Sequence, residues 1–295
     1  MKNTIITVLL GLSCCFLSNK TQAQDMLPKM EDSLVNLADS IYRTPVPEMR
    51  IDVNIRFGKM LVRALEQPNS YNYPFEQLAK KIRIIYPEDK SFRIFKWVVP
   101  YSDFGRRYYA AIQQPGEKLV LSPLKDVSEK HVKDGQDVAL TNGEWFGGEI
   151  YRIRAVTDAK GRKIYTLFTY NNDGLYTTKK IADAMVFEEG KPVFNLPIFA
   201  LPDAKNAQDF KMRFILEYKK EIQTSLNYND EQGVIVFDRL ASEVNNPSVK
   251  STYIPTGQND GLQWTGSIWK FVSSIIKPMK LKDGQAPLDG VMSTN

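Results

Sequence analysis

The stretch "FRIFKWVVPYSDFGRRYYAAIQ", residues 92–113, decides the fold. Its two halves, 92–99 and 106–113, are rich in aromatic and β-branched residues, and Pro100 to Gly105 separate them. Two such runs on either side of a short segment of turn-forming residues are typical of a β-hairpin. The stretch therefore predicts an antiparallel pair of strands.

The chain after this hairpin continues in the same way. Alternating runs at 151–156, 163–170 and 210–220 are bounded by turn residues such as "DAKGR" (158–162), and "GVIVFDRL", "STYIP" and "IWKFV" follow. We expect about ten to twelve short strands with no helices between them. Tight turns make neighbouring strands antiparallel. The fold class predicted is mainly β, an antiparallel meander closing into a barrel-like or sandwich-like roll, with a small propeller as the alternative.

The chain before this hairpin has helical periodicity instead. Apolar residues recur at spacings of three and four in residues 27–43, 48–65 and 75–85, which predicts three helices. Prolines near residues 45–47 and 68 separate them, because proline has no amide hydrogen to donate. We expect a helical N-terminal segment over 24–89, a β domain over 90–275 and a C-terminal tail with little pattern over 276–295.

Residues 1–23 have the features of a signal peptide. Lys2 precedes an apolar run, Ile5 to Leu17, that is shorter than the roughly 20 residues of a membrane span, and Ala23 provides a small residue at the cleavage site. We expect cleavage between Ala23 and Gln24 and a periplasmic or secreted protein. An uncleaved anchor is one alternative, and a lipoprotein is the other, because Cys14 and Cys15 lie in this segment.

Composition excludes several chemistries. Without residues 1–23 the chain has no cysteine and a single histidine, His131, so zinc and thiol chemistry are not expected. It has 37 basic and 34 acidic side chains, a balance too even for nucleic-acid binding. No second apolar run reaches membrane length, so we expect no transmembrane span in the mature chain. The sequence has no phosphate loop and no dinucleotide-binding motif either, so we expect no cofactor.

Three Asn-Asp clusters stand out, at 171–174, 229–233 and 259–261. Asn and Asp followed by Gly favour tight turns, because the central residues of these turns need positive φ. We therefore interpret all three as hairpin corners. The alternative is that the turns gather at one rim and share a calcium ion, although no cluster has the spacing of a calcium loop.

The segment "NGEWFGGEIY" (142–151) is the most suggestive candidate for ligand binding. Aromatic faces stack on sugars or apolar ligands, and glycines allow close approach of the backbone. The candidate ligand-binding residues are Glu144, Trp145, Phe146 and Glu149, together with Asp173 and Asp260 of the turns. The alternative is that Trp145 and Phe146 plug the end of the core.

Seven motifs in order, "FRIFKW", "YYAAIQ", "EWFGGEIYRI", "YTLFTYNNDGLYTTKKIADAMVF", "RFILEY", "VIVFDRL" and "YIPTGQNDGLQWTGSIWKFV", cover residues 92–272. In this order they resemble a family of exported, uncharacterised proteins of Bacteroidota-type bacteria. The resemblance implies a periplasmic or outer-membrane setting and brings no activity or catalytic residue.

Together these observations favour a non-enzymatic binding or accessory module of the cell envelope, with a glycan, a peptide or another envelope protein as its partner. The competing hypothesis is a polysaccharide hydrolase with two facing carboxylates, which retaining and inverting glycosidases hold about 5 to 10 Å apart.

Overall fold

The computed structural model of the protein describes residues 26–103 and 105–275. The predicted signal peptide and C-terminal tail lie outside these residues. The described chain begins with a helix over residues 26–43 and continues with α2 (Pro47–Leu65), so the first two predicted helices are confirmed. Pro47 occupies the first turn of α2, where its missing amide hydrogen does no harm. Phe57, Leu61 and Ala64 on one face of α2 are buried.

The third predicted helix, 75–85, is wrong. This segment contains a short 3₁₀ turn, Leu78–Lys80, followed by the strand β1 (Arg83–Ile85), which pairs with β2. Phe75 has a φ of 53°, outside the helical region. Phe75, Leu78 and Ile82 are nevertheless buried, because the sheet edge and the two helices cover them without a regular helix.

The strands form three sheets. The first sheet has the order β1-β2-β3-β4-β5. Its other strands are β2 (Arg93–Pro100), β3 (Arg106–Gln114), β4 (Val120–Asp126) and β5 (Glu144–Trp145). The hairpin predicted from residues 92–113 is confirmed as β2 and β3, with Trp97 opposite Tyr109.

The second and third sheets also follow the chain in meanders. The second has the order β11-β8-β7-β6, with β9 paired to β8, and the third has the order β10-β15-β14-β13-β12. The strands of the second sheet are β6 (Glu149–Thr157), β7 (Lys163–Asn171), β8 (Thr177–Glu188), β9 (Lys191–Val193) and β11 (Arg213–Lys219). The strands of the third sheet are β10 (Phe199–Ala200), β12 (Leu226–Asn229), β13 (Val234–Ser242), β14 (Tyr253–Trp264) and β15 (Trp269–Val272).

Antiparallel pairing prevails, as predicted, but β4 pairs with β5 and β10 with β15 in parallel.

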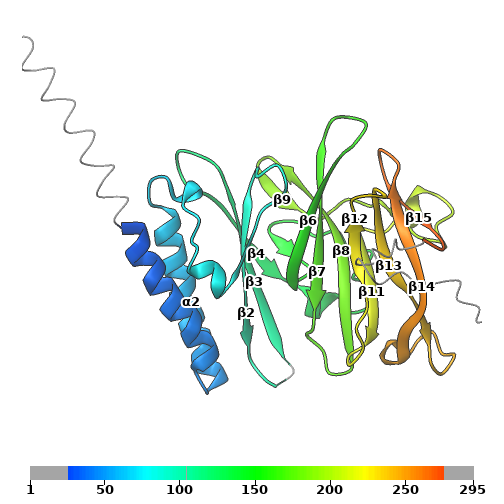
Figure 1. The fold of residues 1–295 in the computed structure, drawn as a ribbon, viewed down its shortest axis with the longest axis horizontal. Coiled ribbons are helices and arrows are strands. Elements are labelled where there is room, and N and C mark those ends of the chain that lie inside the picture. Colours follow the sequence, from blue (N-terminus) through cyan, green and yellow to red (C-terminus); the bar gives the residue numbers. More distant parts are fainter. Residues whose placement is uncertain (1–25, 104, 276–295) are drawn as a thin grey trace, which may run out of the picture.

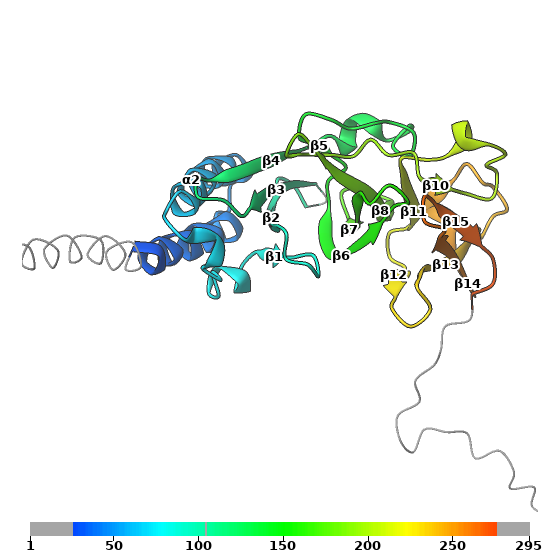
Figure 2. The same cartoon turned by 90° about the horizontal axis from the view of Figure 1, so that it is seen from above.

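Helices and sheets are stacked in layers, in the order helices, first sheet, second sheet and third sheet (Figure 1; seen from above in Figure 2). One apolar core lies between the helices and the first sheet, a second between the first and second sheets, and a third between the second and third sheets. None of the sheets closes into a barrel, so the barrel prediction is wrong. The layers lie side by side rather than around a central axis, so the propeller alternative is wrong as well.

The stacking explains why seven of the eight residues of β2 are buried, Arg93 and Lys96 among them. Phe95 and Trp97 face the helices, whereas Ile94 and Val98 face the second sheet. A strand covered on both faces has no wet side, so the usual alternation of apolar and polar residues disappears.

Two of the three Asn-Asp clusters are turns, as predicted: residues 172–176 join β7 to β8, and residues 230–233 join β12 to β13. The third prediction is wrong, because Asn259, Asp260 and Gly261 lie inside β14. The chain instead turns at residues 265–268, between β14 and β15.

Within the described residues, no helix combines the length and the apolar character needed to cross a membrane. The same residues contain no group of three His, Cys, Asp or Glu side chains that would hold a metal ion.

Candidate functional site

The structure places Trp145 and Phe146 in the core between the first and second sheets, with 1% and 2% of their surface exposed. Their rings therefore fill the core, and only Phe146 also reaches the wall of a cleft. The glycine pair that follows allows close approach to the protein's own groups. A Cβ on Gly147 would overlap the carboxylate of Asp126, and one on Gly148 would overlap Thr169.

Glu149 holds the buried Lys96. The Glu149 Oε2 lies 2.6 Å from Lys96 Nζ, and the lysine side chain is 2% exposed whereas the glutamate side chain is 47% exposed. Burial lowers the pKa of Lys96 to about 8, although Glu149 acts in the opposite direction. Because Lys96 lies on β2 and Glu149 on β6, this ion pair links the first sheet to the second.

Glu144 lies on β5, which pairs in parallel with β4 at Lys125.

Asp173 lies at the turn between β7 and β8 and accepts a hydrogen bond from the backbone amide of Arg106, at 2.9 Å. Burial raises the pKa of Asp173 above its usual range. The neighbouring Asn172 donates its amide hydrogen to the hydroxyl of Tyr108, at 2.8 Å. Burial raises the pKa of Tyr108, and the charges of Glu149 and Asp173 raise it further. These contacts fasten the turn to the first sheet.

Asp260 lies opposite Phe237 in the pairing of β13 with β14. Its two carboxylate oxygens accept hydrogen bonds from Arg239, at 2.9 Å from Nε and 2.5 Å from Nη2. The amide of Ser274 adds a third, at 3.0 Å. The Arg239 hydrogen bonds hold the pKa of Asp260 below its usual range, although burial acts in the opposite direction.

Five carboxylates that a hydrolase could use are held by other groups: those of Glu149, Asp173, Asp230, Asp238 and Asp260. Asp230 binds Arg152, and Asp238 accepts hydrogen bonds from Thr224 and Ser225. As described above, Glu149 binds Lys96, Asp173 accepts a hydrogen bond from the amide of Arg106, and Asp260 binds Arg239. None of these contacts joins two carboxylates.

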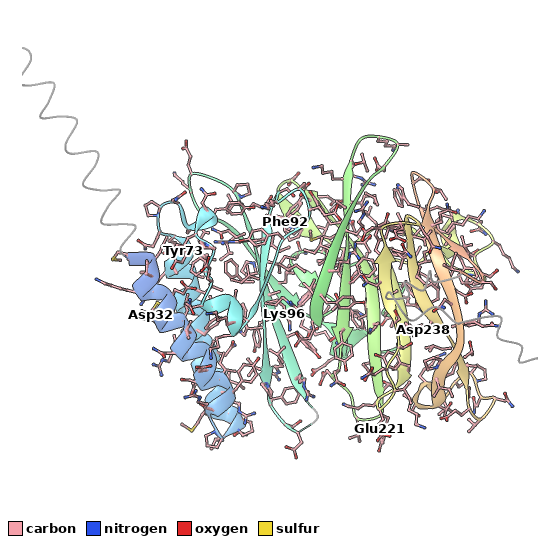
Figure 3. All side chains as sticks on the ribbon, viewed as in Figure 1. Asp32, Tyr73, Phe92, Lys96, Glu221 and Asp238 are labelled. Carbon is pink, nitrogen blue, oxygen red and sulfur yellow. The ribbon has the colours of Figure 1, made fainter. Side chains whose placement is uncertain are left out.

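The site that the structure does provide is a cleft of about 550 Å³ between the edge of the second sheet and the third sheet. We call it the β11 cleft. Its lining includes residues 214–217 of β11, residues 237–240 of β13, four residues of the loop 132–136 (132, 133, 135 and 136), and Leu201, Lys250 and Phe271. Figure 3 labels Asp238, one of its lining residues, on the third sheet. Of the six candidate residues from the sequence, Phe146 and Asp260 line this cleft.

Aromatic and aliphatic side chains form the floor of the β11 cleft. The rings of Phe214 and Phe237 lie 4.5 Å apart between centroids, and Phe271 lies 6.4 Å from Phe237. Leu216 and Leu240 continue this apolar surface. Pockets of several hundred Å³ with apolar walls and a few polar groups are the usual ligand sites of proteins.

Basic side chains prevail at the rim of the β11 cleft. Lys179 lies 3.8 Å from Glu217, and Arg239 is neutralised by Asp260. Lys133 and Lys250 also line the cleft and are exposed, and no acid among the described residues pairs with them. Lys250 Nζ lies 4.1 Å from the centroid of the Tyr253 ring. The rim therefore presents two lysines without an acidic partner to a ligand, beside one further acid of the lining, Asp238, which accepts hydrogen bonds from Thr224 and Ser225.

Most residues of the β11 cleft carry no local signal in the sequence. The floor comes from strands that look like any half-buried strand, and the loop 132–136 lies about 80 residues before β11. One signal does exist. In "GVIVFDRL", the charged pair Asp238-Arg239 follows directly after four buried apolar residues, which marks the point where β13 leaves the core.

Comparison with known proteins gives no match: neither a family model, nor a curated protein, nor a solved structure aligns significantly with this chain. The resemblance to exported Bacteroidota-type proteins therefore stays a prediction.

Proposed function

We propose that this protein is a non-enzymatic binding module of the bacterial cell envelope and that the β11 cleft holds its ligand. The observation that carries the proposal is the combination of an aromatic floor with two lysines, Lys133 and Lys250, that have no acidic partner among the described residues. Such a surface suits a ligand with an apolar part and a negative charge. The envelope setting rests on the signal-peptide features of residues 1–23.

The layered architecture supports a binding role over a catalytic one. The sandwich-like stack of sheets provides a rigid scaffold, and the cleft opens where the second sheet ends, at β11, beside the third sheet. A general acid or base needs a carboxylate or another titratable group close to the reacting bond. In the β11 cleft Asp260 is committed to Arg239, and Glu217 accepts a hydrogen bond from Thr177 at 2.7 Å.

The test uses 1-anilinonaphthalene-8-sulfonate, a fluorescent probe with aromatic rings and one negative charge. We expect saturable binding that Leu240→Glu weakens at least about tenfold, because it places a charge in the apolar floor. The matched control is Leu175→Glu, at an exposed leucine in the turn between β7 and β8, which should bind like the wild type. Equal binding by both variants, with both folded by circular dichroism, would remove the cleft from the proposal.

The non-enzymatic part has its own test. The protein is incubated with peptidoglycan and with acidic polysaccharides, and newly formed reducing ends are measured. We expect none. Release of reducing ends that disappears in Glu149→Gln or Glu144→Gln would instead support the hydrolase hypothesis.

A further inference from the structure

The β11 cleft follows the edge of a strand rather than its face. Phe214, Ile215, Leu216 and Glu217 are consecutive, and all four line the cleft. Successive side chains of a strand point to opposite faces, so a surface that touches four in a row must run along the edge. β11 is the terminal strand of the second sheet, and its outer edge faces away from β8.

The backbone of β11 offers hydrogen-bonding groups along this edge. The amide of Ile215 donates to the side-chain Oε1 of Gln136, at 3.2 Å, so the backbone groups of Ile215 point away from β8. In an antiparallel strand every second residue points its N–H and C=O the same way, so those of Glu217 point outward too. Gln136 accepts a hydrogen bond from the amide of Ile215. Among the described residues, no corresponding acceptor is seen for the amide of Glu217. An edge of this kind is a template for another strand.

The opposite wall is also the side of a strand. Phe237, Asp238, Arg239 and Leu240 of β13 all line the cleft. β12 pairs with β13 as far as Phe237, and the amide of Asp238 still donates to the carbonyl of Ser225 at 3.0 Å, so the pairing on that side ends at Asp238. The pairing of β13 with β14 shifts register between Asp238 and Leu240, a bulge that turns the second half of β13. An extended chain in the cleft therefore lies between the edge of β11 and the third sheet, to which β14 and β15 contribute Asp260 and Phe271.

The charges and the floor define the chemistry of such a chain. Phe214, Phe237 and Phe271 accept apolar side chains, and Lys133 and Lys250 attract acidic ones. Alternation of apolar and acidic residues matches the period of two with which an added strand presents its side chains.

We propose that the β11 cleft binds an extended acidic segment of another envelope protein, which adds to β11 as a further strand. This inference rests on the function proposed above and names the ligand class of that same site. A small anionic amphiphile would use the floor and the lysines but would not need the outward amide of Glu217, and that amide provides the test.

The probe is a fluorescein-labelled peptide in which leucine or valine alternates with glutamate, long enough to pair with β11 on either side of Glu217. Binding to the full-length purified protein is measured by fluorescence anisotropy. Two further peptides carry N-methyl groups on every second amide, in the two possible registers. We expect one register to lose at least about tenfold in affinity and the other to lose little, because only one set of amides faces β11.

Two variants at one position isolate the backbone of the protein. Glu217→Pro and Glu217→Ala both remove the carboxylate that holds Thr177, but only proline removes the outward amide hydrogen. We expect Glu217→Ala to bind the peptide and Glu217→Pro to lose at least about tenfold. Both should still bind 1-anilinonaphthalene-8-sulfonate, which reports that the cleft is intact. Lys250→Glu should weaken binding of the peptide, whereas Lys118→Glu, at an exposed lysine outside the cleft, should leave that binding unchanged.

The outcomes separate the two proposals. If the aromatic probe binds in the cleft but peptide binding is absent or insensitive to the register of N-methylation and to Glu217→Pro, strand addition is wrong and the binding module stands as a carrier of small anionic amphiphiles. If neither the probe nor the peptide binds, the proposed function fails together with this inference.

Discussion

Substituting Lys96 by methionine should change the pH dependence of stability in a defined direction. Lys96 lies on β2 of the first sheet, where Figure 3 labels it, and its side chain is 2% exposed. Glu149 neutralises it at 2.6 Å, but burial still lowers the pKa of Lys96 to about 8 from the ordinary 10.5. Arg83 adds to this lowering. The folded protein thus holds this proton less tightly than the unfolded chain does.

The sign of the effect follows from the bound protons. Between about pH 8 and 10.5 the unfolded chain keeps the Lys96 proton while the folded protein releases it, so the free energy of unfolding rises with pH. A difference of about 2.5 pKa units corresponds to about 3 kcal/mol. Tyr108, Tyr151 and Tyr218 have pKa values raised by burial and act in the opposite direction above about pH 10. The usable window is therefore pH 8 to 10, where Lys96 should contribute about 2 kcal/mol.

The assay is urea unfolding followed by circular dichroism at several pH values in this window. The wild type should gain about 2 kcal/mol relative to Lys96→Met, and the variant should be the more stable protein at pH 7 by up to about 3 kcal/mol, because it no longer buries an ammonium group. The control is Lys163→Met, which breaks a half-exposed pair with Asp89 and should keep the wild-type rise. A wild type and a Lys96→Met variant with parallel pH profiles would refute the reasoning.

Three further substitutions probe packing and pairing through the same unfolding measurement. Gly147→Ala should lower the free energy of unfolding by about 3 kcal/mol, because its Cβ overlaps the carboxylate of Asp126. Gly58→Ala should raise it by about 1 kcal/mol, because Gly58 is inside α2 with open space around it. Asp260→Asn should lower it by about 2 kcal/mol at neutral pH. Because Arg239 holds the pKa of Asp260 low, this deficit should shrink as the pH falls below about 4 and the wild-type carboxylate takes up a proton.

The hairpins could be predicted because their signals are local. "DAKGR" joins β6 to β7, and residues 230–233 join β12 to β13, since turn residues decide the chain direction within a few positions. Asn259 to Gly261 have the same composition but lie inside β14, because a distant partner overrides the local preference. Asp260 pairs there with Arg239, and Gly261 leaves the space that the side chain of Ile275 occupies.

The third predicted helix is absent for the same reason, because contacts with residues distant in the sequence decide the backbone of residues 75–85. Residues 75–85 bury the apolar stripe that the helical period indicates, but they bury it under the first two helices and beside β2. The carboxylate of Glu31 in the first helix accepts hydrogen bonds from the backbone amides of Gln77 and Leu78, which fixes a short 3₁₀ turn at that point. Apolar periodicity therefore indicated which residues are buried and not the backbone that buries them.

The β11 cleft was out of reach of sequence reasoning for a different reason. Residues 132–136, 214–217 and 237–240 meet only because one sheet ends beside another, and sheet order is a property of the whole chain. The segment 142–151 is aromatic and glycine-rich, which made it a candidate for ligand binding. Its aromatic rings fill the core, and its glycines accommodate the protein's own Asp126 and Thr169.

The floor of the β11 cleft is also part of the core between the second and third sheets, which couples binding to stability. Phe214 and Phe237 belong to that core, so a ligand seated on them adds apolar contacts to the folded protein alone. A ligand that binds only the folded state stabilises it by RT ln(1 + [L]/Kd), about 2.7 kcal/mol at a concentration of a hundred times Kd. The alternating peptide should therefore raise the urea midpoint of the wild type and of Glu217→Ala but leave that of Glu217→Pro unchanged. A peptide that shifts all three midpoints equally would bind by its side chains alone, because only the proline variant lacks the outward amide.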